Sequence, residues 1–138
     1  GKGKSALWVV VLHLALGRRA RIQQLRYVAH LVAAHPHVVV MGDLNSGPQS
    51  HEIEEFCSRS GLMLPPRPPL TFPSWQPQRA IDHILLSPGL EVLEYKALQT
   101  TVSDHLPLAI RIRLPDSLPR HSNGDDQQKD PEQPRQAG

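Results

Sequence analysis

The hydrophobic and polar positions of the first 114 residues follow strand-like and helix-like periods in turn. Continuous β-branched runs are typical of buried strands, and the first of them is expected to be buried on both faces. Apolar residues at a spacing of 3.6 positions predict an amphipathic helix that ends where His35 precedes a proline. Strands are expected at residues 7–12, 37–41, 80–86, 91–98 and 106–114, and helices at residues 19–34 and 48–59.

This order of elements, β-α-β-α-β-β-β, predicts an α/β layered domain and not a helical bundle or an all-β barrel. Gly61 is placed to cap the end of the second helix. Residues 64–78 contain six prolines and no periodicity, which predicts an irregular loop. Trp75 in this loop is expected to anchor it, with stacking on a substrate as the alternative.

Composition divides the chain near Pro115. Residues 1–114 hold 12 Lys and Arg against 8 Asp and Glu, and they contain nearly all of the large apolar residues. Residues 115–138 hold 3 Lys and Arg against 5 Asp and Glu, with four prolines and Leu118 as the one large apolar residue. Such a segment cannot bury enough surface to offset its ordering entropy. We therefore predict a domain at residues 1–114 and a disordered tail at residues 115–138.

Charge and cysteine content exclude several classes of protein. A net charge of +2 is too mild for a protein that coats DNA, and the single Cys57 excludes an intrachain disulfide framework or a cysteine-based zinc site. The longest apolar run, at residues 6–12, is far shorter than the roughly 20 residues of a membrane span. With no visible leader, we predict no stable membrane insertion and a cytoplasmic location.

Polar residues of catalytic type fall at the ends of four predicted strands or inside them. They are His13, Asp43, Asn45, Asp82, Asp104 and His105. Taken singly, most have an ordinary structural explanation, because Asp, Asn and Ser form turns and a strand-end histidine is usually hydrogen-bonded. Asp82 is different, since it lies between Ile81 and Ile84 and a buried carboxylate must meet a cation, a histidine or a metal.

Together these residues favour phosphoryl hydrolysis. That reaction needs oxygen ligands for a hard cation, which Asp43 and Asp104 offer, and a donor to a phosphate oxygen, which Asn45 offers. A His–Asp pair adds an oriented imidazole. The sequence contains no H-x-x-x-H pair for zinc, no G-x-S-x-G nucleophile motif and no P-loop, which argues against those chemistries.

Four segments carry a family resemblance: VVLHL at residues 10–14, VVMGDLN at 39–45, AIDHILLS at 80–87 and SDHLPL at 103–108. In this order and spacing they resemble the endonuclease/exonuclease/phosphatase family, which has the DNase I-like fold. The resemblance implies a four-layer α/β sandwich and hydrolysis of phosphate esters that depends on a divalent ion, Mg²⁺ or Mn²⁺.

The resemblance also implies a role for each matching residue. Asp43 would orient the attacking water, and Asn45 would hold the phosphate. Asp104 would be a metal ligand. His105 would be the general base or would stabilise the transition state, with Asp82 orienting its imidazole. His13 would contact the phosphate.

The family pattern also includes an N-terminal half with an Asn and a metal-supporting Glu, and nothing in this chain matches that half. The chain therefore resembles the C-terminal half of the domain. An apolar sheet face would then lack a partner, and the metal would lose a carboxylate.

The leading hypothesis is a metal-dependent phosphoesterase whose substrate is a nucleic acid, a lipid head group or a small phosphoester. Low aromatic content, 4%, gives little sign of a surface that tracks a nucleic-acid strand. The alternative is an inactive family fragment that acts only by binding. A third hypothesis is an unrelated α/β binding domain with coincidental motifs. The sequence does not indicate which protein partners the chain has.

Overall fold

The computed structural model describes residues 6–100 and 102–118. Five strands and two helices follow one another in the predicted order. They are β1 (Trp8–His13), α1 (Arg18–Val32), β2 (Val38–Asp43), α2 (His51–Ser60), β3 (Asp82–Leu86), β4 (Glu91–Ala97) and β5 (Leu108–Arg113). Every element type expected from the sequence is thus confirmed, with ends displaced by at most three residues.

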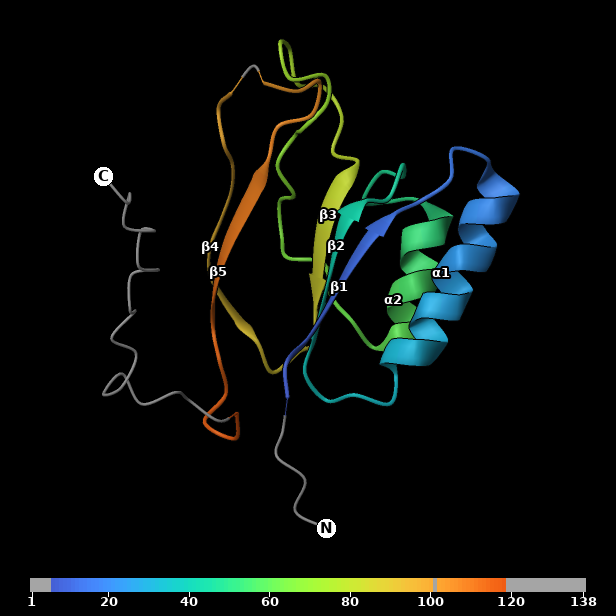
Figure 1. Cartoon of the computed structure of the whole chain (residues 1–138), viewed down its shortest axis with the longest axis vertical. Coiled ribbons are helices and arrows are strands. Elements are labelled where there is room, and N and C mark those ends of the chain that lie inside the picture. Colours follow the sequence, from blue (N-terminus) through green and yellow to red (C-terminus); the bar gives the residue numbers. More distant parts are fainter. Residues whose placement is uncertain (1–5, 101, 119–138) are drawn as a thin grey trace, which may run out of the picture.

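The elements form three layers (Figure 1). A three-stranded sheet of order β1-β2-β3 lies in the middle, with α1 and α2 against one of its faces and the two-stranded sheet of β4 and β5 against the other. β1 pairs in parallel with β2, and α1 supplies the crossover that a parallel pair needs, whereas β2 pairs antiparallel with β3.

Two hydrophobic clusters hold these layers together. The first lies between the helices and the middle sheet, and its most enclosed side chains include Phe56, Ile53 and Leu85. The second lies between the two sheets and includes Val39 of β2 and Ile84 of β3. Alternate residues of each central strand therefore serve different clusters, which is why the strands appear as continuous apolar runs.

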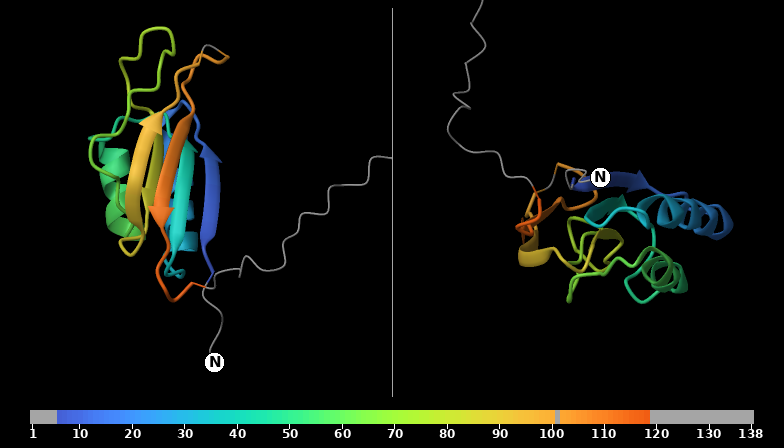
Figure 2. Two further views of the ribbon diagram at one scale, coloured as in Figure 1. Left: turned by 90° about the vertical axis from the view of Figure 1, so that its left-hand side faces the viewer. Right: turned by 90° about the horizontal axis from the view of Figure 1, so that it is seen from below.

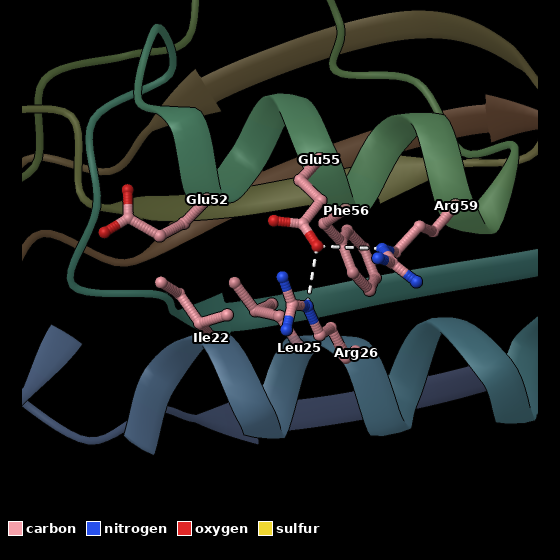
Figure 3. Close-up of a pocket in the computed structure, with 7 residues that line it drawn as sticks. All are labelled: Ile22, Leu25, Arg26, Glu52, Glu55, Phe56 and Arg59. Atoms are coloured by element: carbon pink, nitrogen blue, oxygen red, sulfur yellow. Dashed lines mark hydrogen bonds and ion pairs between the residues drawn. The ribbon is translucent and has the colours of Figure 1, made fainter. Parts of the chain in front are cut away.

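The contact between α1 and α2 combines apolar packing with ion pairs. Leu25 and Phe56 meet between the helices, and Glu55 lies between Arg26 and Arg59 at their outer edge (Figure 3). The Glu55 Oε1 atom is 2.7 Å from Arg26 Nε and 2.8 Å from Arg59 Nε. Ion pairs between exposed side chains contribute little to stability, so these outer ion pairs add little to the apolar contacts beside them.

The ends of α2 match its sequence signals. The Ser50 hydroxyl accepts a hydrogen bond from the backbone N–H of Ile53, a standard N-cap. Gly61 takes the left-handed conformation with a φ of 77°, and its N–H donates to the Cys57 carbonyl. The predicted glycine cap is therefore confirmed.

The prediction that the first strand is buried on both faces is wrong. Val10 and Leu12 pack against the first cluster, but Val9 and Val11 on the other face are exposed. The reason is that the β4–β5 sheet is narrower than the middle sheet. In Figure 2 (left), β1 projects beyond β5 and is not covered by it.

Trp75 does not anchor the proline-rich loop, because 72% of its surface is exposed. That prediction is wrong. The loop is held by other contacts, among them the antiparallel bridge between Phe72 and Arg79.

The packed part of the chain reaches at least Leu118, which is buried in the second cluster. This is four residues beyond the predicted domain boundary at 114. The remainder of the predicted tail, residues 119–138, lies outside the described residues. Neither of the described helices is long and apolar enough to span a membrane.

Candidate active site

Strand register brings three of the predicted site residues into one row. His13 pairs with Asp43 across β1 and β2, and Asp43 pairs with Asp82 across β2 and β3. Two of these residues end their strands and the third begins an antiparallel one, so all three lie at the same edge of the sheet. This is the edge at which crevices form in α/β sheets.

Gly42 permits the close strand approach beside this row. Its φ is 140°, and a Cβ atom there would lie only 1.8 Å from the Leu12 carbonyl oxygen. A side chain at position 42 would push β2 away from β1. The glycine before Asp43 is therefore required by geometry and not only by the turn that follows.

His105 enters the site from the loop before β5. Its Nδ1 atom lies 2.7 Å from Asp82 Oδ2. Because a carboxylate only accepts hydrogen bonds, the imidazole carries its proton on Nδ1 and leaves Nε2 to exchange a proton. The Phe72 ring packs on the imidazole at a centroid distance of 4.8 Å and restricts its rotation.

The charge state of His105 reflects its neighbours. Partial burial lowers the pKa of His105, but the hydrogen bond to Asp82 and the negative charges of Asp82, Asp43 and Asp104 outweigh it. The pKa of His105 is therefore raised above the usual value of histidine. The protonated imidazole persists to a higher pH than in a free histidine.

Thr71 is a site residue that the sequence analysis missed. Its hydroxyl donates a 2.5 Å hydrogen bond to Asp82 Oδ2, the same oxygen that His105 contacts. Thr71 is fully buried, and its carbonyl oxygen accepts from the N–H of Leu106 at 2.8 Å. One residue of the proline-rich loop thus fixes both members of the His–Asp pair. The only sequence signal was that Asp82 needed partners.

The two loops around His105 are also joined to each other. Ser74 donates from its N–H to the Asp104 carbonyl at 2.7 Å and from its hydroxyl to the Ser103 carbonyl at 2.5 Å. The proline-rich loop therefore acts as a support for the segment that carries His105. This accounts for an ordered, non-periodic loop beside the site.

Asp43 and Asn45 form a compact turn after β2. Asp43 Oδ1 accepts from the Asn45 N–H at 2.9 Å, and Asn45 has a positive φ of 47°. The Asn45 side-chain amide donates to the Leu14 carbonyl at 2.7 Å. The two residues thus form the turn that their sequence allowed. The hydrogen bonds of this turn do not use Asp43 Oδ2 or the side-chain carbonyl oxygen of Asn45.

Asp43 Oδ2 lies between two imidazoles, 3.8 Å from His13 Nε2 and 3.8 Å from His105 Nε2. Both distances exceed that of a hydrogen bond and leave room for an intervening atom. The ligand atoms of Asp43, Asp82 and His105 lie within 4.8 Å of one another. This group offers carboxylate oxygen and imidazole nitrogen to a divalent ion.

The donors fit such an ion in part. Asp82 Oδ2 already accepts two hydrogen bonds, so Asp43 Oδ2 is the carboxylate oxygen of the group best placed to bind a cation. Asp104 does not belong to the three-residue group. It is exposed in the preceding loop, and its Oδ1 lies 3.2 Å from the Ser103 hydroxyl, which donates to it.

His83, which is not among the predicted site residues, lies next to Asp82 on β3 and contacts the turn after β2. It is fully buried, and its Nε2–H donates to the Ser46 carbonyl at 2.7 Å. Burial lowers the pKa of His83 despite this hydrogen bond and the nearby carboxylates, which act in the opposite direction. A neutral His83 therefore ties β3 to the turn that carries Asn45.

An open groove of about 370 Å³ begins at Asp82 and His105 and continues between the two sheets. Its walls away from the site are apolar, with Val11, Met41 and Leu108 among the lining residues. The groove is thus polar where it meets Asp82 and His105 and apolar along the rest of its length.

Comparison with known proteins places this arrangement in a family. The model of the endonuclease/exonuclease/phosphatase family matches residues 6–105, which include all six predicted site residues. No curated protein matches the sequence.

Several solved structures share the fold. A mannosyl-6-phosphatase from Bacteroides thetaiotaomicron is 21% identical with a TM-score of 0.68, and the match covers 77% of this chain and 51% of that one. A family protein of the same organism is 22% identical with a TM-score of 0.65, covering 75% and 48%. The human Nocturnin catalytic domain, with a bound sulfate anion, is 22% identical with a TM-score of 0.53, covering 76% and 45%.

The chain spans about half the length of these structures, and at this level of identity they establish the DNase I-like fold. The family match over residues 6–105 agrees with this fold. So does the row formed by His13, Asp43 and Asp82 at one edge of the middle sheet. The chain belongs to the endonuclease/exonuclease/phosphatase family.

Proposed function

We propose that this chain carries the acid–base part of a phosphoesterase that depends on a divalent metal ion. The observation that carries the proposal is the 2.7 Å contact between His105 and Asp82, with Asp43 beside it in the same row. A positioned imidazole with an orienting carboxylate is suited to general acid–base catalysis. Family membership supports hydrolysis of a phosphate ester as the reaction.

In this proposal each residue acts at a defined atom. Asp82 and Thr71 hold His105 so that Nε2 faces the reacting phosphate. Asp43 Oδ2 orients the attacking water, and His105 Nε2, 3.8 Å away, exchanges a proton or stabilises the charge that develops on phosphorus. Asn45, from the turn after β2, and His13, at the end of β1, contact phosphate oxygens.

Asp104, together with Asp43, would hold Mg²⁺ or Mn²⁺. Mg²⁺ typically takes one or two carboxylates and keeps several waters, so two aspartates at a solvent-open edge suit it. When bound, the ion supplies charge neutralisation for the phosphate and a more acidic water. The exposed position of Asp104 leaves it accessible to such an ion.

The substrate class is supported only coarsely. The similarity to a mannosyl-6-phosphatase favours a small phosphoester, and the sulfate bound in the Nocturnin domain favours a site for a tetrahedral anion. Nucleic-acid and lipid phosphodiesters stay as alternatives. We propose a cytoplasmic location on the sequence alone.

The decisive experiment measures hydrolysis of p-nitrophenyl phosphate and bis-p-nitrophenyl phosphate with Mg²⁺, with Mn²⁺ and with chelator. We expect turnover that requires the metal and is lost in Asp104→Ala. Asp116→Ala, in the segment after β5, is the matched control and should retain full turnover. The ratio of the hydrolysis rates of the two substrates distinguishes a phosphomonoesterase from a phosphodiesterase.

A second candidate function is binding without catalysis. It is favoured by the half-length match and by the small group of donors among the described residues. Absence of turnover in a protein whose circular dichroism shows the α/β fold would favour this candidate. Binding of inorganic phosphate, followed by calorimetry, would then be its positive evidence.

A further inference from the structure

The outer face of α1 carries apolar side chains that no part of the described chain covers. α1 lies in the outermost layer of the fold (Figure 1). Leu25 is buried in the first cluster, and Tyr27 lies two residues further on, about 200° around the helix axis. Tyr27 is accordingly 66% exposed, and Leu31, about one turn later, is 49% exposed. Leu16, just before the helix, is 85% exposed, and none of these three side chains belongs to either hydrophobic cluster.

Basic side chains lie beside this apolar surface. α1 contains four arginines and no acidic residue. One side of the helix presents polar and basic residues that recur every three or four positions: Arg19, Gln23, Arg26 and His30. Arg26 stays 53% exposed although it forms an ion pair with α2. The outer face of α1 therefore combines exposed apolar groups with positive charge.

The arginines at the start of α1 are not explained by the stability of the helix. The N-terminus of a helix carries partial positive charge, so acidic residues are favourable there and cations are not. α2 follows this rule with Glu52 and Glu54 in its first turn, whereas the first turn of α1 contains Arg18, Arg19 and Arg21. Arg18 and Arg21 are paired with Glu52, but Arg19 has no ionic partner among the described residues. The charge of Arg19 is therefore available to a partner outside the chain.

Several occupants fit this face poorly. Residues 119–138 contain no Val, Ile, Leu, Met, Phe, Trp or Tyr, so this part of the chain cannot cover Tyr27 and Leu31. A second copy would bring the arginines of two α1 helices together, and like charges across an interface are unfavourable. An unmatched half of the domain would pack against the sheets, whereas Tyr27 faces away from them. A nucleic-acid backbone would use the arginines but would leave the apolar side chains exposed to water.

We propose that the outer face of α1 is a docking surface for a membrane that contains anionic lipids. A helix with basic residues on one side and exposed apolar residues beside them lies in the plane of such a membrane surface, with its apolar side chains at the boundary of the acyl chains. The ring of Tyr27 suits this boundary because it is apolar and ends in a polar hydroxyl. Arg19 and Arg26 would be attracted to the anionic head groups. The docking is peripheral and reversible, because three apolar side chains bury little area, and it does not depend on catalysis.

The first test measures co-sedimentation of the whole 138-residue chain with lipid vesicles in the absence of metal. Vesicles of phosphatidylcholine with about one-third phosphatidylserine are compared with vesicles of phosphatidylcholine alone. We expect binding to the anionic vesicles to be at least about tenfold tighter and to weaken as salt is added, because salt screens exposed charges. Arg19→Gln should weaken this binding about fivefold, since one arginine near the anionic surface is lost.

A matched pair of double variants locates the apolar contact. Tyr27→Ser with Leu31→Ser should weaken binding to the anionic vesicles at least about tenfold, because both side chains lose their contact with the membrane. The control is Trp75→Ser with Leu70→Ser in the proline-rich loop, where the two side chains are exposed to nearly the same extent, 72% and 47%. We expect the control to change binding by less than about twofold. Circular dichroism shows whether each variant is folded, and Tyr27→Ser alone replaces the double variant if the latter is not.

Fluorescence reports which side chain enters the membrane. Tyr27→Trp is introduced into a chain in which both natural tryptophans, Trp8 and Trp75, are replaced by Phe. The emission of the single indole should shift to shorter wavelength on anionic vesicles and should be quenched by brominated lipid. The chain with Trp8→Phe alone keeps Trp75 as its one indole and should show neither change.

Three outcomes would overturn the proposal. The first is equal binding to the two kinds of vesicle, and the second is a loss of binding in the loop control as large as that in the α1 variant. The third is a single-stranded oligonucleotide that displaces the chain from vesicles and binds equally well to the variant with Tyr27→Ser and Leu31→Ser. That outcome would assign the arginines of α1 to a nucleic-acid backbone.

Discussion

Asp82 Oδ2 accepts hydrogen bonds from both His105 Nδ1 and the Thr71 hydroxyl, at 2.7 Å and 2.5 Å. The three residues come from β3, the loop before β5 and the proline-rich loop. Two donors on a single oxygen fix the carboxylate in place, and the carboxylate in turn fixes the imidazole. The pair is therefore held in place by a residue of β3 together with two segments that have no regular structure of their own.

Asp82→Asn should lower the pKa of His105. The substitution removes the negative charge that, with the hydrogen bond, outweighs the effect of burial. The measurement is a pH titration of the His105 imidazole by NMR in the absence of metal. Glu91→Gln, which alters a carboxylate paired with Arg113 on the outer sheet, is the control.

The same change has a defined effect on stability. A raised pKa of His105 in the folded state stabilises the protein at pH values below its unfolded pKa, near 6.5, and this stabilisation is lost as the pH rises through the folded value. The difference in unfolding free energy between wild type and Asp82→Asn should thus be greater at pH 5 than at pH 8. An equal difference at both values would contradict this assignment.

Thr71→Val should damage the site while preserving its shape. The buried Asp82 oxygen loses a donor, and we expect a loss of about 1–3 kcal/mol in unfolding free energy. If the proposed function is correct, kcat should fall while KM stays nearly constant, because Thr71 acts through Asp82. Thr71→Ser keeps the hydroxyl and should restore most of both quantities. Urea unfolding and steady-state kinetics supply the measurements.

Gly42→Ala should destabilise the middle sheet by about 3–5 kcal/mol, since the new methyl group would overlap the Leu12 carbonyl and the backbone would be strained. The matched control is Gly89→Ala, where a Cβ atom would meet nothing within 4 Å. We expect the control to change stability by less than about 1 kcal/mol. Comparable losses in both variants, measured by urea unfolding, would show that the close approach of β1 and β2 is not the cause.

Glu52→Gln should reduce stability at neutral pH by about 1–3 kcal/mol, because buried Glu52 accepts from Arg21 and Arg18. A backbone hydrogen bond and the two arginines lower the pKa of Glu52 against the opposing effect of burial. Because the pKa of Glu52 is lowered in the folded state, its ionised form stabilises the fold at pH values above the unfolded pKa. This stabilisation is lost as the pH falls through the folded pKa.

The effect of this substitution should accordingly shrink in acid, as followed by thermal unfolding from pH 7 to pH 3. Glu55→Gln is the control on the same helix, and its exposed ion pairs should make the change smaller at every pH. A larger effect at Glu55 than at Glu52 would contradict the difference in burial.

Most secondary structure was predictable because its signals are local. The spacing of Leu25, Ala29 and Val32 is sufficient to predict a helix and the face that it buries. Gly61 was predictable for the same reason, since a left-handed cap depends on the residue that occupies it. Leu31 on α1 is an exception, being exposed although it lies beside the apolar stripe.

The sequence was sufficient to predict which residues belong to the candidate site, but not which contacts they make. The positions of His13, Asp43 and Asp82 at strand ends follow from the apolar runs beside them. Their alignment in one row depends on strand register, which is set by the packing of whole sheets. Thr71 was missed because its distance from Asp82 depends on the path of a loop that has no periodicity.

The sequence by itself determined the order and type of the elements, the edge at which the polar residues gather and the family to which the motifs point, since each depends on neighbours along the chain. Only the tertiary structure decided which atoms meet at Asp82 and that one face of β1 is bare. Burial of a strand depends on what lies across from it, and an apolar run such as residues 7–12 carries no information about whether that cover is present.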